Sequence, residues 1–515
     1  MRCCGPSGAV RLIVVPLAAL AVLAGCRGDN EQRIDLAVIG RPADLAERGA
    51  RLGVAGQLVQ AATAQGLVAL DAQGQVVPAL ADRWIVTDDG DSYIFRLRDG
   101  TWPDGTPLSG QTVARALRQA LDGLRGTPLG LDLADLAEVR VMTDRVLELR
   151  LARPVPELLQ LLAQPELALR RRERGSGPLE PAASAAGTLR LVLIPPTRLG
   201  LPALDPADPR PASLQLRALS ARAATEAFAR GELSLVFGGR FADLPQAQAV
   251  AGLSRRALQV DPAAGLFGLA VVGAEGPLAA PEFREALAMA IDRDALAGAM
   301  GLTGWTPTTR IVPLSVPGSG GALTLPARAG AEPAAPVQAA APAWTTAPLD
   351  LRQAEAAARV ARWTGRSGRP LASLRLAWPS GPGADAVFER LRTDFAAIGV
   401  TLTRVAAEAP ADLRLLDLVA RYPGPLWYLN QLSCPARRTI CSTAADARLA
   451  EARAERDPAR RLAMLAAVEA QMSAAAVFLP LGPPVRWSLV RPGTPGFAPN
   501  TVAFHPLPPL VEQTD

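Results

Sequence analysis

The chain has 515 residues, enough for two or three domains with large apolar cores. Its 54 basic and 49 acidic residues give a formal charge of +5, and aromatic residues make up only 4%. Because the charges are interspersed, the sequence lacks the concentrated basic face of a DNA- or RNA-binding protein. The main basic run, Arg170 to Arg174, is interpreted as a solvated loop.

The N-terminal segment has the pattern of a secretory signal peptide. Arg2 and Arg11 precede 13 uncharged residues, Leu12 to Ala24, a run too short to span a bilayer as a helix. Leu23 to Cys26 resembles a bacterial lipobox, which predicts cleavage after residue 25 and attachment of lipid to the Cys26 thiol. The alternative is an ordinary secretory cleavage site followed by an incidental cysteine.

Predicted strands and helices follow along the chain. Residues 34–39, "IDLAVI", predict a strand, and residues 51–64 have helical spacing. Apolar runs separated by turn residues between Gln65 and Leu108 predict strands and hairpins, and Ser109 is the expected N-cap of a helix. From Leu189 onward, β-rich runs alternate with helical patterns, which argues for an α/β fold.

Two cysteines remain far along the chain, Cys434 and Cys441, with six residues between them. In an oxidising envelope compartment, an isolated pair at this spacing predicts a disulfide, and two free thiols are the alternative. The sequence holds a single histidine, His505, so no metal site is expected.

A dense set of motif residues lies between residues 66 and 113. It includes Gly66-Leu67-Val68, Pro78-Ala79-Leu80-Ala81, Tyr93, Leu97-Arg98 and Asp104-Gly105-Thr106-Pro107-Leu108. In this stretch the chain resembles solute-binding protein family 5, the peptide-, oligopeptide- and nickel-binding components of ABC transporters. The resemblance continues at lower density over most of the chain, for example in "GSGPL" at 175–179.

This resemblance implies an α/β, two-lobed periplasmic-binding-protein-like fold of class II type, with a small mainly β subdomain inserted in the first lobe. The first lobe would comprise residues 26–63, 171–265 and 481–515, the inserted subdomain 64–170, and the second lobe 266–480. Within the second lobe, the Pro/Ala-rich stretch 306–350 is interpreted as an extended surface loop.

The resemblance also implies a binding protein rather than an enzyme. The sequence has no G-x-S-x-G elbow, no metal-binding His pair and no phosphate loop, and no cofactor is expected. We therefore expect a monomeric periplasmic lipoprotein, anchored at Cys26, that delivers a peptide or other small solute to the permease subunits of an ABC transporter. The alternatives are an envelope binding lipoprotein that acts as a sensor or chaperone without transport, an envelope hydrolase, and a nickel or haem binder within the family.

The segment from Val419 to Cys434 resembles the part of the family that lines the ligand cleft. Arg421, Tyr422, Trp427 and Tyr428 are the predicted ligand-binding residues. Arg421 stands where peptide-binding members have an acidic residue that pairs with the ligand's ammonium group, so an arginine there favours an anionic ligand instead. As alternatives, Arg421 points to solvent or pairs with a nearby acid such as Asp417, and each aromatic residue packs in the core.

Overall fold

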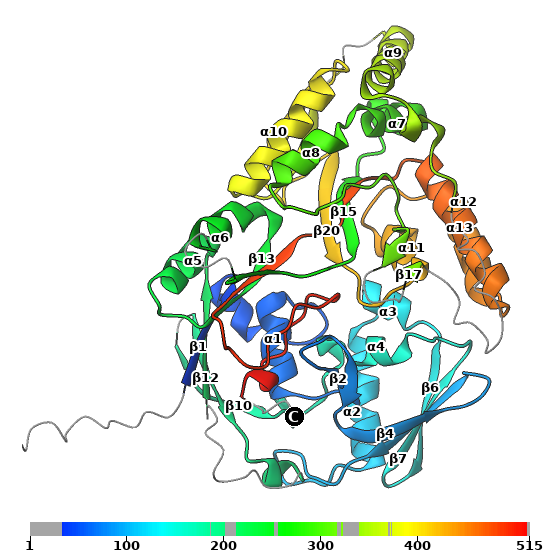
Figure 1. Ribbon diagram of the computed structural model, residues 1–515. Coiled ribbons are helices and arrows are strands. Elements are labelled where there is room, and N and C mark those ends of the chain that lie inside the picture. Colours follow the sequence, from blue (N-terminus) through cyan, green and yellow to red (C-terminus); the bar gives the residue numbers. More distant parts are fainter. Residues whose placement is uncertain are drawn as a thin grey trace, which may run out of the picture.

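The computed structural model of the protein describes residues 33–185, 187–200, 213–251, 256–316, 321–322, 339–368, 371 and 373–511. The predicted signal peptide, Cys26 and residues 317–320 and 323–338 of the predicted loop therefore lie outside the described residues. Within the described part, three sheets have four or more strands, and Figure 1 shows how the chain distributes them. Among the helices described, none is both long enough and apolar enough to cross a membrane.

A seven-stranded sheet organises the first lobe, in the order β10-β11-β12-β1-β13-β22-β14. β1 lies at its centre, parallel to β12 and β13, and its Leu36, Ala37 and Val38 are fully buried, as expected of a strand covered on both faces. The elements of this lobe are β1 (Arg33–Ile39), α1 (Val54–Thr63), β10 (Leu179–Ala185), β11 (Thr188–Leu193), β12 (Ser213–Leu219), α5 (Ala221–Ala229), β13 (Leu235–Arg240), α6 (Leu244–Ala251), β14 (Leu258–Val260) and β22 (Arg486–Val490).

The inserted subdomain is built on an antiparallel sheet in the order β4-β5-β7-β6, with α2 packed against it. Ser109 caps α2 as predicted, because its hydroxyl accepts a hydrogen bond from the backbone N–H of Thr112 at 3.3 Å. The elements are β2 (Val68–Leu70), β3 (Val76–Pro78), β4 (Ala81–Val86), β5 (Ser92–Leu97), α2 (Gly110–Gly123), α3 (Pro128–Asp132), β6 (Leu136–Thr143), β7 (Val146–Leu151), α4 (Leu158–Leu162), the 3-10 helix η2 (Pro165–Leu167), β8 (Arg170–Arg171) and β9 (Arg174–Gly175).

The second lobe is built on a five-stranded sheet in the order β19-β18-β20-β15-β21. Figure 1 shows α8 and α10 on one side of its strands and α12 and α13 on the other. The elements are β15 (Gly265–Val271), α7 (Pro281–Ala290), α8 (Arg293–Met300), β16 (Ser315–Val316), β17 (Gly321–Ala322), α9 (Leu349–Ser367), β18 (Leu374–Ala377), α10 (Pro382–Ala396), β19 (Leu402–Val405), β20 (Leu413–Val419), α11 (Pro425–Leu432), the 3-10 helix η7 (Cys434–Ala436), α12 (Thr443–Ala454), α13 (Pro458–Ala474) and β21 (Phe478–Gly482).

The chain passes between the two large sheets twice, at residues 261–264 between β14 and β15 and at 483–485 between β21 and β22. These passages are neighbours, because the backbone N–H of Asp261 donates to the carbonyl of Arg486 at 3.0 Å. The lobe boundaries expected from the sequence, 265/266 and 480/481, lie within β15 and β21, and they stay a prediction. Two adjacent connections are the arrangement from which a hinge between lobes is built.

Candidate ligand-binding cleft

A cavity of about 910 Å³ lies where the two lobes and the inserted subdomain meet. This volume is in the range of sites that hold drug-sized or short-peptide ligands. The first lobe contributes residues 50–54, Gln57 and Leu58 around the start of α1, 237–240 at the end of β13, Asp261, 486–488 and 502–505. The subdomain contributes Leu70, 126–129 and 164–166, and the second lobe contributes 417–421, Trp427, Gln431 and 435–438.

Arg421 lines this cavity, but its charge is already matched. Its guanidinium donates to both carboxylate oxygens of Glu166 in η2, at 2.7 and 2.9 Å, and to the Gln164 side-chain oxygen at 2.7 Å. Burial alone would raise the pKa of the Glu166 carboxyl, yet the charge and hydrogen bonds of Arg421 outweigh burial and lower that pKa. The expected alternative partner, Asp417, is occupied by Arg486 instead.

Tyr422 does not line the cavity, and it joins the second lobe to the inserted subdomain instead. Its hydroxyl donates to Oδ1 of Asp132 at the end of α3, at 3.2 Å, and Nδ2 of Asn430 in α11 donates to the same oxygen at 2.6 Å. Burial raises the pKa of Asp132 to about 6, although both hydrogen bonds oppose that shift. Burial also raises the pKa of Tyr422.

The two aromatic residues of α11 have different positions. Trp427 lines the cavity, and its indole Nε1 is buried without a hydrogen-bond partner. Tyr428 is fully buried behind it, with the two rings edge to face at 5.0 Å between centroids. The alternative of core packing therefore describes Tyr422 and Tyr428, because both are buried and neither lines the cavity.

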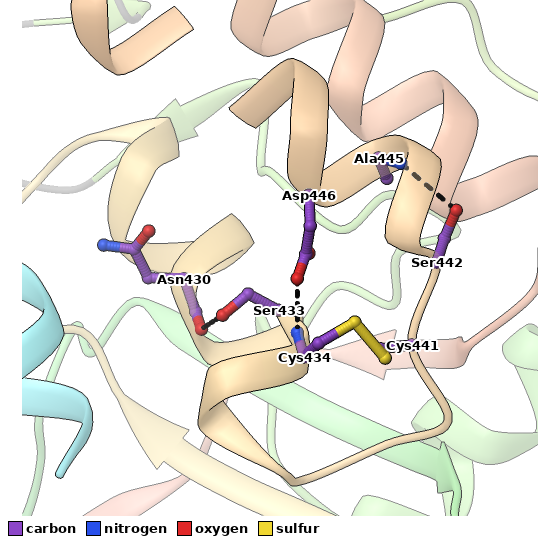
Figure 2. Close-up of a disulfide and its surroundings, with 7 residues drawn as sticks. All are labelled: Asn430, Ser433, Cys434, Cys441, Ser442, Ala445 and Asp446. Carbon is purple, nitrogen blue, oxygen red and sulfur yellow. Dashed lines mark hydrogen bonds between the residues drawn. A yellow bond between two sulfur atoms is a disulfide. The ribbon is translucent and has the colours of Figure 1, made fainter. Parts of the chain in front are cut away.

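The segment after α11 is closed by a disulfide between Cys434 and Cys441, as Figure 2 shows. The backbone N–H of Cys434 donates to Oδ2 of Asp446 in α12 at 2.8 Å, and the hydroxyl of Ser442 caps the same helix by accepting from the Ala445 N–H at 3.2 Å. Four residues of the closed loop, 435–438, line the cavity. The disulfide therefore fixes a piece of the cavity wall.

The sequence model of the bacterial extracellular solute-binding proteins, family 5 Middle, matches residues 75–189 and 201–434, which is more than half of the chain. The chain belongs to this family. As a family 5 member it has the two-lobed α/β fold of periplasmic binding proteins, and its relatives are binding proteins rather than enzymes.

Curated relatives match this family 5 protein over a limited stretch. The probable deoxycholate-binding periplasmic protein YgiS of Escherichia coli is 35% identical over 122 residues, which cover 20% of this chain and 23% of YgiS. The periplasmic oligopeptide-binding protein OppA of Escherichia coli is 29% identical over 120 residues, which cover 20% of this chain and 22% of OppA. The matched stretch thus spans less than a quarter of either relative.

Solved structures of the fold match almost the whole chain. The murein tripeptide binding protein MppA of Escherichia coli has a TM-score of 0.75 at 18% identity, covering 92% of this chain and 97% of MppA. Haemophilus influenzae OppA in complex with the peptide RPPGFSPFR has a TM-score of 0.75 at 17% identity, covering 93% and 98%. At these identities the likeness establishes the fold alone.

Several polar residues of the family 5 cleft escaped sequence reasoning. Nε2 of His505 lies 3.1 Å from Oδ2 of Asp261 beside the first passage, and the imidazole stacks near Phe237 and Phe497. Arg486 donates to the Asp417 carboxylate at 2.7 Å and so joins the two lobes beside the second passage. No local motif marks such residues, because each pair joins segments that are far apart in the chain.

Within the described residues, no group of three or more His, Cys, Asp or Glu could hold a metal.

Proposed function

We propose that the protein is an extracytoplasmic solute-binding lipoprotein of an ABC importer. It binds a peptide or peptide-like solute in the interlobe cleft and delivers that solute to a membrane permease. The observation that carries the proposal is the cavity of about 910 Å³ lined by both lobes and the inserted subdomain of a family 5 fold. Relatives and structural neighbours named as oligopeptide- and tripeptide-binding proteins support the peptide class.

The mechanism is a shift between open and closed forms and needs no covalent chemistry. Adjacent passages at 261–264 and 483–485 allow the lobes to turn relative to one another. A solute that contacts both walls of the cleft stabilises the closed form by its differential affinity for that form. The permease then recognises and binds the closed form. We further propose that the chain acts as a periplasmic monomer held at a membrane by lipid on Cys26, without cofactor or nucleic acid.

Two measurements on the full chain test this function. Native mass spectrometry of protein purified without denaturation should detect a bound peptide or peptide-like solute. Photo-crosslinking in membranes of the bacterium that makes the chain should then capture a permease subunit when that solute is present. A bound solute without any permease adduct would support the sensor or chaperone alternative, and a protein that takes no solute in either experiment would contradict the binding function.

A further inference from the structure

The charged side chains that line the cleft are strongly unequal in sign. Three of the lining residues are acidic, Glu166, Asp261 and Asp417. Six are arginines, and they come from both lobes: Arg51, Arg240, Arg421, Arg437, Arg438 and Arg486. A cleft wall of one predominant sign concentrates solutes of the opposite sign.

All three acidic groups are already engaged within the protein. Glu166 pairs with Arg421, and Asp417 pairs with Arg486 at 2.7 Å. Asp261 accepts from the backbone N–H of Asn500 at 2.9 Å and lies against His505. The cleft therefore has no free carboxylate among its described lining residues with which to receive the ammonium group of a ligand.

Four of the lining arginines lack a carboxylate of their own, three because they form no ion pair with a described residue and one because it shares its partner with another arginine. Among the described residues, Arg51, Arg437 and Arg438 form no ion pair, and Arg240 forms a long one, at 3.8 Å, with Asp417, a carboxylate that also pairs with Arg486. Burial and the nearby charge of Arg421 lower the pKa of Arg438, and burial and Arg486 lower that of Arg240. The carboxylates of Asp417 and Asp243 oppose this shift of the Arg240 pKa, and that of Asp132 opposes the shift of the Arg438 pKa, but burial and the neighbouring arginine outweigh them.

Hydrogen-bond donors are also left over at this surface. Two lining residues have a buried side-chain nitrogen without a partner, Nε of Arg438 and Nε1 of Trp427, and both atoms are donors. A buried donor without an acceptor carries a free-energy cost that an acceptor on a ligand removes. The arginines and the two unpaired N–H donors of the cleft therefore favour a ligand that carries negative charge and acceptor oxygens.

We propose that the cleft selects an anionic, peptide-like solute with at least two carboxylate groups, one bound by Arg437 and Arg438 and the other by Arg51 and Arg240. The guanidinium fork suits carboxylates, and the disulfide between Cys434 and Cys441 holds the first pair in place. Since the two pairs belong to different lobes, their repulsion favours an open cleft, and a dianion placed between them favours closure. This inference rests on the proposed function and names its ligand class.

Three blocked tripeptides of the same length test the proposal by calorimetric titration of the full chain: N-acetyl-Glu-Ala-Glu-amide, N-acetyl-Gln-Ala-Gln-amide and N-acetyl-Lys-Ala-Lys-amide. The acidic peptide should bind at least ten-fold more tightly than its isosteric glutamine counterpart, and the lysine peptide most weakly. Changing Arg437→Gln together with Arg438→Gln should weaken binding of the acidic peptide about ten- to hundred-fold, and Arg240→Gln should do the same. Arg222→Gln, at an exposed arginine of α5, is the matched control and should leave affinity unchanged.

The outcomes separate this inference from the function on which it rests. If the glutamine or lysine peptide binds as tightly as the acidic one, or if the arginine variants bind the acidic peptide like the wild type, the anionic class is wrong while peptide binding stands. If none of the three peptides binds, the inference is wrong, and the native mass spectrometry described above decides the proposed function separately. Thermal unfolding of each variant shows that a lost affinity does not come from a lost fold.

Discussion

Asp132 in the inserted subdomain and Asn430 in the second lobe are joined by a hydrogen bond of 2.6 Å from Nδ2 to Oδ1. The other carboxylate oxygen of Asp132 is buried without a partner. The subdomain and the second lobe therefore meet at a carboxyl group whose environment favours the protonated form.

This environment makes stability depend on pH. The pKa of Asp132 is about 6 in the folded protein, against an ordinary value of 3.8, so the folded state holds this proton more tightly than the unfolded chain. The stabilising contribution is complete below about pH 4, is lost as pH rises through about 6, and then stays lost. It amounts to roughly 3 kcal/mol over that window. Denaturant unfolding between pH 4 and 7 measures it. Asp132→Asn should flatten this part of the profile, whereas Asp122→Asn, at an exposed carboxylate, should leave it unchanged.

Arg421 should contribute to stability through Glu166. In Arg421→Ala the Glu166 carboxylate stays buried without its cation, and the free energy of unfolding should fall by roughly 3 kcal/mol. Adding Glu166→Gln should recover a large part of that loss. Arg222→Ala, which breaks an exposed pair with Glu226, should cost less than about 0.5 kcal/mol. Equal losses in the two arginine variants would contradict the pairing, and a double-mutant cycle measures it directly.

The pairing of Arg421 with Glu166 changes the expected effect of an acidic residue at position 421. From the resemblance alone, we would expect Arg421→Asp to restore the acidic residue of the peptide-binding members and to favour ligands with a free amine. In this protein the new carboxylate would face Glu166, so we expect Arg421→Asp to be less stable than Arg421→Ala. Exchanging the charges, in Arg421→Glu with Glu166→Arg, should recover stability relative to either single change. Thermal unfolding of these five variants ranks their stabilities.

Much of the fold followed from local patterns. The strand at 33–39, the Ser109 cap and the alternation of strands and helices after residue 189 depend on residues close together in the chain. The cleft depends on distant ones. Arg421 and Glu166 are 255 positions apart, and the direction of a side chain such as Tyr422 depends on the packing around it. The resemblance to the family therefore indicated which segment approaches the cleft, but not which of its side chains line it.

Reduction of the disulfide should destabilise the protein. The bond between Cys434 and Cys441 closes a short loop, and its loss in Cys434→Ser with Cys441→Ser should lower the free energy of unfolding by about 2 to 3 kcal/mol. Peptide mapping of the unreduced native protein should recover the two cysteines in one linked species. Two thiols that react with an alkylating agent before reduction would contradict the bond.

Cys26 should hold the protein at a membrane. Cys26→Ser should move the protein from the membrane fraction to the soluble envelope fraction, because the lipid attachment atom is lost. Cys3→Ser is the matched control, since Cys3 leaves with the predicted signal peptide and its loss should change nothing. Mass spectrometry of the wild type should find lipid on Cys26. A Cys26→Ser variant that resists extraction as the wild type does would contradict the anchor.

The position of β22 in the first-lobe sheet constrains the order in which the parts of the protein can fold. β22 comes near the end of the chain, yet it lies between β13 and β14, and β14 is joined to the sheet through it. While a ribosome is still adding the second lobe, the first-lobe sheet ends at β13 with an unpaired edge, which is a template for aggregation. The first lobe can be completed only after residue 490 has emerged. The first-lobe sheet is therefore completed late, after the second lobe has been synthesised, which suits a protein that we propose to be exported before it folds.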